Sequence, residues 1–246
     1  MQQQHPKLRD QRKLHANEPY GLNLIPDEVV YAVGESFVYL LYTGRKDLGG
    51  NDWGDVFAEA VGGQHLGSPV GIADVIKNRM AWSMKTVKNT DPFSATSVRL
   101  ISGRCSPDYS FGISDPHEDV QKTGRAVLEI WNERVNIAKE EYAHVRSCIL
   151  VRSDDMTKFL LFEDVCDRFR TVDYTWEANK NGNLIGRRKG DGEICFTWQP
   201  HGSQFTIHTK VPADAVKFTI KRPPELEKEE VIRLIGFDRT WVEISR

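Results

Sequence analysis

The stretch VGIADVIKNRMAWSMKTVK, residues 70–88, decides how the middle of the chain folds. Residues 70–76 are small or branched and follow a proline, which is typical of a buried strand. Residues 77–79 are polar enough for a tight turn, and residues 81–88 form the expected partner strand. The sequence therefore predicts a hairpin that carries Asp74 in the middle of its first strand.

This hairpin would bring Asp74 beside Lys85. Ser83 and Lys85 are two residues apart, so they point to the same face of their strand. Lys85 stands among apolar neighbours, and an unpaired charge in apolar surroundings is costly. The conjunction favours either mutual pairing of the two charges or a bound metal ion.

Two helices are predicted before the hairpin. The first begins at Pro26 and Asp27, ends near Gly44, and carries apolar residues at helical spacing. The second begins at Asn51 or Asp52 and ends at Gly62. Its polar side holds Asp55 and, one turn later, Glu59. Glu59 precedes Asp74 closely enough in the chain to reach the same edge of the sheet.

After the hairpin, residues 89–114 read as a long irregular connection. An amphipathic helix is predicted over residues 116–142, and two strands over 147–151 and 158–162. This order predicts an α/β fold in which a mixed central β-sheet is flanked by helices.

Beyond Cys166 the sequence becomes rich in turn signals and aromatic residues, which predicts a β-rich C-terminal extension. We divide the chain into a mobile arm (1–20), a core (21–165) and the extension (166–246), which belongs to the same domain as the core. Residues 179–222 hold eight Lys or Arg against three acids, a basic region that the formal net charge of −2 conceals.

Composition excludes several classes of protein. The 246 residues contain no apolar run long enough to span a membrane, and the first twenty lack the apolar core of a signal peptide, so a cytoplasmic protein is expected. The four cysteines form no CxxC pair, which predicts reduced thiols and neither a zinc site nor a redox motif. His65 and His117 lack a second histidine at ligand spacing. No small-molecule cofactor is indicated.

The run Ser68-Pro69-Val70-Gly71-Ile72-Ala73-Asp74, followed eight residues later by Ser83-Met84-Lys85, resembles the signature of PD-(D/E)XK nucleases, especially type II restriction endonucleases. The resemblance covers residues 50–165. It implies a restriction-endonuclease-like core, a homodimer that binds duplex DNA, and Mg²⁺-dependent hydrolysis of phosphodiester bonds at a specific DNA sequence.

The resemblance also assigns roles to residues. It implies that Asp74 binds Mg²⁺, that Lys85 is catalytic and that Glu59 is the helical glutamate of the family. The chain departs from the pattern because Pro69 is not adjacent to the aspartate and Ser83 replaces the second carboxylate. That replacement places weight on Glu59 and Asp55 as further metal ligands, with Ser83 in the active site.

Proteins bind DNA phosphates with cationic side chains. They read base edges with amide or cationic side chains. The candidates are Lys88, Arg104, Arg187, Arg188, Lys189, Gln199, His201 and Gln204.

Three other interpretations stay open. The chain could be a DNA-binding module that does not cleave, with a structural acidic cluster. It could be a repair nuclease that recognises the shape of DNA. It could also be a protein-interaction domain, whose binding would not depend on salt.

Overall fold

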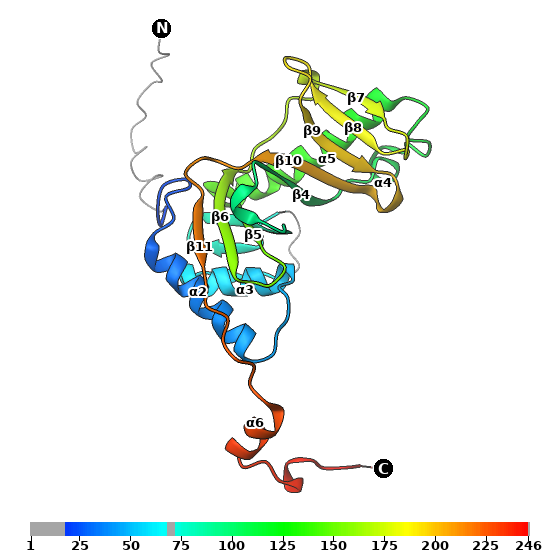
Figure 1. The fold of residues 1–246 in the computed structure, drawn as a ribbon. Coiled ribbons are helices and arrows are strands. Elements are labelled where there is room, and N and C mark those ends of the chain that lie inside the picture. Colours follow the sequence, from blue (N-terminus) through cyan, green and yellow to red (C-terminus); the bar gives the residue numbers. More distant parts are fainter. Residues whose placement is uncertain (1–17, 68–71, 246) are drawn as a thin grey trace.

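The computed structural model describes residues 18–67 and 72–245, and it contains two β-sheets with helices packed against them (Figure 1). The helices are α2 (Asp27–Tyr42), α3 (Gly50–Val61), α4 (Pro107–Phe111), α5 (Val120–Glu141) and α6 (Lys228–Leu234). Short 3-10 helices lie at Pro92–Ser94 (η1), Thr171–Asp173 (η2), His201–Ser203 (η3) and Arg239–Trp241 (η4). Residues 68–71 of the nuclease-like signature and most of the predicted N-terminal arm lie outside the described residues.

The first sheet is mixed and six-stranded. Its order is β1 (Gln64–His65), β2 (Val75–Lys77), β3 (Met80–Lys88), β5 (His144–Arg152), β6 (Lys158–Val165) and β11 (Val216–Thr219). β3 and β5 pair in parallel, whereas the other neighbouring strands are antiparallel. Parallel neighbours need a crossover, and α5 lies in the connection between β3 and β5. The predicted mixed α/β class is confirmed.

One face of this sheet packs against α2 and α3. Trp82 and Met84 of β3 point to this face and join a buried cluster with side chains from both helices. Phe37 of α2 stacks on Phe159 of β6, with ring centroids 4.8 Å apart, and Phe57 of α3 meets the edge of Trp82 at 5.4 Å. We call this surface the helix face of the sheet.

A buried charged network also lies on the helix face. The Glu163 carboxylate of β6 accepts hydrogen bonds from Trp82 Nε1 (2.6 Å), Tyr20 Oη (3.0 Å) and Arg146 Nη1 (2.8 Å). Arg146 also pairs with Glu18, which ties the chain before α2 to the sheet. Burial beside Glu163 raises the pKa of Tyr20 far above its ordinary value, so this phenol stays a donor.

The opposite face of the first sheet, which we call the polar-row face, is covered by α5 at one end and by β4 (Ser97–Arg104) at the other. Ala81 and Val145 pack with α5, while Ile149 and Phe162 pack with Val98 and Leu100 of β4. The predicted layer of helices on both faces is therefore only partly present, since a strand covers half of this face.

The second sheet has five strands in the order β4, β10 (Gln204–Lys210), β9 (Ile194–Gln199), β8 (Leu184–Arg188) and β7 (Tyr174–Ala178), all antiparallel. It projects beyond the first sheet and packs one face on α5 (Figure 1). Gly124 permits this packing, because a Cβ there would lie 2.2 Å from the Trp176 ring of β7. Gly124 is thus a position where α5 and the second sheet approach closely.

The two sheets do not follow the boundary at residues 165 and 166 that the sequence suggested. β4 belongs to the earlier segment yet pairs with β10, and β11 belongs to the later segment yet pairs with β6. The chain after residue 166 is β-rich, as expected, but it contributes to both sheets.

Most predicted elements are found. α2, α3 and β3 match their predicted ranges closely, α5 starts at Val120, and β5 and β6 form the predicted hairpin. The irregular connection predicted over residues 89–114 is wrong, because this segment contains β4 and α4. The alternation of exposed and buried residues in β4 is hard to recognise in the sequence, because Ser102 and Gly103 are of the small or polar types that are typical of loops. None of the described helices is long and apolar enough to cross a membrane.

Candidate active site

Asp74 lies immediately before β2 rather than in the centre of a strand. Its N–H donates to the carbonyl of Trp82 (2.9 Å), so the backbone at Asp74 still follows the β2–β3 ladder. Its Oδ2 accepts hydrogen bonds from the Met84 N–H (2.7 Å) and from the Ser83 hydroxyl (3.4 Å). The Asp74 carboxylate thus binds a backbone N–H of β3, that of Met84, at a position where β2 no longer runs alongside β3. Within the described residues Oδ1 accepts no hydrogen bond.

Lys85 shares the polar-row face with Ser83, one residue beyond the amide that Asp74 binds. It is half-buried, and within the described part of the chain it makes no ion pair or hydrogen bond. Its charge lies close enough to the Cys166 thiol to oppose the rise in that thiol's pKa, which burial takes to about 11. Because Lys85 has no ion-pair partner among the described residues, its charge is free to bind an anionic ligand.

Polar side chains form a row across this face. Ser83 of β3 is in register with Ser147 of β5, which is in register with Asp164 of β6. With neighbouring strands about 4.8 Å apart, Asp74 and Asp164 are separated by about 14 Å and are too far apart to share one metal ion. The nearby Ser147 hydroxyl opposes the rise in the pKa of the Cys166 thiol that burial causes. Desolvation raises the pKa of Asp164, opposed by a hydrogen bond from the Val165 N–H.

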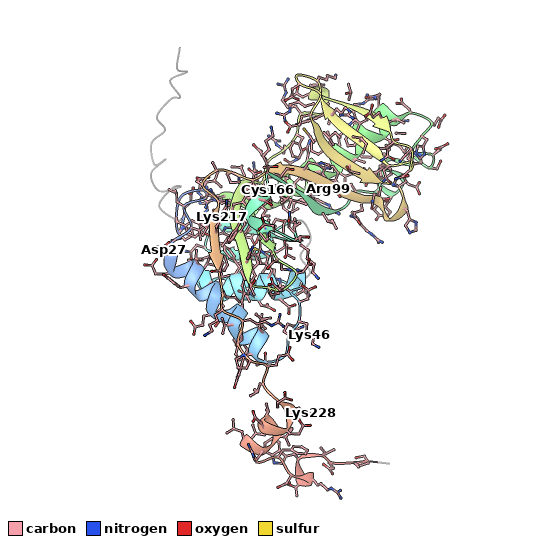
Figure 2. All side chains as sticks on the ribbon, viewed as in Figure 1. Asp27, Lys46, Arg99, Cys166, Lys217 and Lys228 are labelled. Carbon is pink, nitrogen blue, oxygen red and sulfur yellow. The ribbon has the colours of Figure 1, made fainter. Side chains whose placement is uncertain are left out.

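A cavity of about 500 Å³ lies over the far end of the polar row. It is lined by Ser147 and Asp164 of the first sheet, Ser102 of β4, Trp131 of α5 and residues of β9 and β10. Figure 2 places Cys166, another lining residue, where the two sheets meet. The cavity therefore reaches Ser147 and Asp164 of the polar row, whereas Asp74, Ser83 and Lys85 do not line it.

Asp55 and Glu59 do not join this site. α3 packs on the helix face of the sheet, whereas Ser83 and Lys85 point to the polar-row face. The Asp55 carboxylate lies 2.7 Å from His65 Nδ1, and Glu59 is exposed in a groove between α2 and α3. Across residues 18–67 and 72–245 no group of three or more His, Cys, Asp or Glu side chains could hold a metal ion. The predicted metal site of Asp74 with Glu59 and Asp55 is therefore not formed.

The predicted DNA-binding residues fall into separate places. Gln204 is in register with Arg104 on one side and with Gln199 on the other, and His201 lies in the η3 turn beside them. These four residues gather at the end of the second sheet farther from the first sheet, and we call them the distal cluster. Arg104 and His201 are exposed.

The other predicted cations are largely neutralised. Arg187 pairs with Glu177 (2.7 Å) and Arg188 with Glu193 (2.6 Å) at the opposite end of the sheet, near Lys189. Lys88 at the end of β3 pairs with Asp47 (2.7 Å). The basic turn of residues 187–189 therefore carries less free positive charge than the sequence indicates, because the partners Glu177 and Asp191 lie close in space.

The outer face of the second sheet adds residues that sequence reasoning did not select. Arg99 and Ile101 of β4 are in register with His208 and Thr206 of β10, and His208 Nε2 lies 2.9 Å from the Thr197 hydroxyl. Burial and the neighbouring Arg99 lower the pKa of His208. The arrangement places an exposed arginine and an exposed isoleucine on the face leading to the distal cluster.

Ser147 and Asp164 were also missed by sequence reasoning. A serine within the apolar run of β5 was a usable signal, because it marks a polar position on a buried face. The register that brings Ser147 beside Ser83 depends on the parallel pairing of β3 and β5, which residue types do not reveal.

Comparison with family models, with curated proteins and with solved structures found no match for this chain.

Proposed function

We propose that this protein is a Mg²⁺-dependent endonuclease, similar to type II restriction enzymes, that hydrolyses double-stranded DNA at a specific sequence. The observation that carries the proposal is the unpaired, half-buried Lys85 on the same face as Ser83, next to the residue whose N–H binds Asp74. A lysine that lacks an ion-pair partner in the described residues, on the same sheet face as the Asp74 carboxylate, suits a site completed by an anionic substrate such as a phosphodiester.

The order of elements supports this proposal. A helix, the β2–β3 hairpin, β4, the crossover helix α5 and the parallel strand β5 follow one another, with Asp74 and Lys85 on the hairpin. The resemblance implies a mixed α/β core, and the first sheet with its crossover helix belongs to this class. A similar fold alone does not establish a nuclease activity, so the residues of the site have to account for it.

The donor set fits Mg²⁺ only in part. Asp74 offers one free carboxylate oxygen, and Mg²⁺ is often held by one or two carboxylates together with water and substrate phosphates. Asp74 would thus hold the ion once DNA is present. When bound, the ion would polarise the phosphate and lower the pKa of the attacking water.

The protein side chains would act around the scissile phosphate. Lys85 would bind a non-bridging phosphate oxygen and stabilise the charge that develops on it. The Ser83 hydroxyl would hold the Asp74 carboxylate in place, and the Met84 N–H fixes its orientation. The distal cluster and Arg99 would contact DNA outside the cut site.

The test compares cleavage of mixed-sequence plasmid and phage DNA with Mg²⁺ or with EDTA. Asp74→Asn keeps an acceptor for the Met84 N–H but removes the charge, and Lys85→Met keeps the apolar stem. Each variant should lower the cleavage rate by about 100-fold or more while leaving the fold intact. Unchanged cleavage in both variants would exclude this site.

Glu59→Gln is the matched control. It removes a carboxylate that the sequence pattern favoured but that lies in the α2–α3 groove, so cleavage should remain within about twofold of wild type. A loss as large as that of Asp74→Asn would show that the α3 glutamate reaches the substrate after all.

A second candidate is a DNA-binding module that does not cleave. The convergence of Arg104, Gln199 and Gln204 at one end of the second sheet favours it. It requires DNA binding that falls steeply with salt, is unaffected by EDTA and Asp74→Asn, and is weakened by Arg104→Ala.

A further inference from the structure

The hairpin of β9 and β10 ends in the η3 turn, at the end of the second sheet where the distal cluster lies (Figure 1). Gln199 and Gln204 face each other across this hairpin, on either side of the turn. Gly202 adopts the left-handed conformation, with φ of 80°, that so tight a turn requires. The hairpin thus ends in a two-stranded tip that carries a side-chain amide on each strand.

The polar groups of this tip are not used within the described part of the chain. The side-chain amides of Gln199 and Gln204 make no hydrogen bond there, and the Arg104 guanidinium makes neither a hydrogen bond nor an ion pair. Arg104 is in register with Gln204, so the three side chains form a row across β4, β10 and β9. Each amide offers donors and an acceptor, and the guanidinium offers parallel donors. The row therefore presents unused hydrogen-bonding groups to a ligand.

The face of the second sheet that carries this row is basic. Register and strand alternation place these basic side chains on it: Arg99, Arg104, Arg187 and Lys210. Glu177 pairs with Arg187 at 2.7 Å, and Glu193 pairs with Lys210 at 2.9 Å. The two remaining arginines have no acidic partner among the described residues. Their free positive charge makes a polyanion the fitting ligand.

The dimensions of the tip suit the major groove of duplex DNA. This groove is about 12 Å wide and admits a two-stranded β-ribbon. With neighbouring strands about 4.8 Å apart, the row from Arg104 to Gln199 spans about 10 Å, which corresponds to about three base-pair steps. Arginine matches the O6 and N7 acceptors of guanine, and glutamine matches the N6 donor and N7 acceptor of adenine. The row thus has the spacing and the chemistry to read consecutive base pairs.

We propose that the β9–β10 hairpin enters the major groove and that Arg104, Gln204 and Gln199 read neighbouring base pairs, the arginine at a guanine and the glutamines at adenines. This assignment rests on the proposed function, because duplex DNA is the substrate, and it adds which residues select the sequence. Arg99 lies towards the end of β4 that packs on the first sheet (Figure 2). It holds a phosphate there, which positions the DNA without reading its sequence.

Selection of bound duplexes from a random-sequence pool tests the base-reading row, with the full-length Asp74→Asn chain so that the DNA stays intact. The selected motif should contain guanine beside adenine. Arg104→Lys keeps the charge but loses the two-pronged geometry, so the preference for guanine should fall by about tenfold or more while DNA is still bound. Gln204→Leu should reduce the preference for adenine at the adjacent position by a similar factor.

Two further variants separate base reading from phosphate binding. Arg99→Ala should weaken binding to every sequence alike and lower the slope of log K against log salt by about one. Arg125→Ala is the matched control, because Arg125 is an exposed arginine of α5, which packs on the other face of the second sheet. It should leave both the selected motif and its affinity unchanged.

The possible results distinguish this proposal from the nuclease proposal. A motif that Arg104→Lys and Gln204→Leu leave unchanged, or binding without any sequence preference, would overturn the base-reading row even if the wild-type chain cuts DNA. A motif that changes with Arg104→Lys, together with a wild-type chain that leaves the same DNA uncut in Mg²⁺, would support the row and reject only the nuclease function.

Discussion

The two faces of the six-stranded sheet are built from the same strands but carry opposite chemistry. On the helix face, Trp82 and Met84 are buried against α2 and α3, and the Glu163 carboxylate there is saturated with donors. On the polar-row face, Ser83 and Lys85 stand between two apolar patches, and Lys85 has no partner among the described residues. Strand alternation lets β3 serve both faces without a change of backbone.

This contrast shows how one strand separates stability from chemistry. On the helix face the Glu163 carboxylate finds its donors within the protein, while Asn23 Nδ2 and Arg152 Nε and Nη1 are buried without a partner in the described part of the chain. On the polar-row face, Asp74 Oδ1 and the Lys85 ammonium are not buried and have no protein partner among the described residues, so they are open to water or to a ligand. We expect substitutions on the helix face to affect stability and substitutions of Asp74 or Lys85 on the polar-row face to affect the proposed DNA cleavage.

The largest expected effect is on the helix face. Trp82→Ala removes a fully buried side chain and its hydrogen bond to Glu163, and it should lower the free energy of unfolding by about 4 kcal/mol. Urea denaturation followed by circular dichroism measures this. Ser83→Ala, the next residue on the polar-row face, should cost less than about 1 kcal/mol. Equal costs would remove the contrast between the two faces.

The charged network should be the next most sensitive feature. Glu163→Gln keeps the shape but leaves Arg146 with only part of its negative partners, so the free energy of unfolding should fall by about 3 kcal/mol. Pairing Glu163→Leu with Arg146→Met should recover part of this loss, because both buried charges are then removed. A double variant less stable than Glu163→Gln would contradict this account.

A smaller effect is expected in α5, the helix that covers one end of the polar-row face. Gly124→Ala would ordinarily stabilise a helix by about 1 kcal/mol. Here the added methyl group would collide with Trp176, so the variant should instead be destabilised by about 1–3 kcal/mol. Thermal unfolding decides between the two signs. Arg125→Ala, at the adjacent exposed position of α5, controls for propensity alone.

The smallest effect depends on pH. Desolvation raises the pKa of Asp164 above its ordinary value of 3.8, so the folded state binds a proton more readily than the unfolded chain. The stability that this carboxyl contributes is present at lower pH and is lost as pH rises through the folded pKa. Asp164→Asn should therefore stabilise the protein slightly at neutral pH and not below pH of about 4. Equal effects at both pH values would show that Asp164 is fully hydrated.

Local patterns predicted the hairpin, the helices and the shared face of Ser83 and Lys85. Those features depend on residues near one another in the chain, where periodicity and capping are informative. The structure does not bring Asp55 and Glu59 to the polar-row face, because α3 packs on the helix face, where Phe57 contacts both Trp53 and Trp82. The ion pairs of Arg187 and Arg188 were likewise hidden by strand pairing.

Each sheet contains strands from both the earlier and the later part of the chain, and this affects how the chain folds during its synthesis. β4 emerges early from the ribosome, but its partner β10 comes only after α5 and the β5–β6 hairpin, and β11 completes the first sheet later still. Until then, β4 and β6 present open edges to their surroundings. Folding of the whole molecule therefore waits for nearly the entire chain, and a truncated nascent product cannot form either complete sheet.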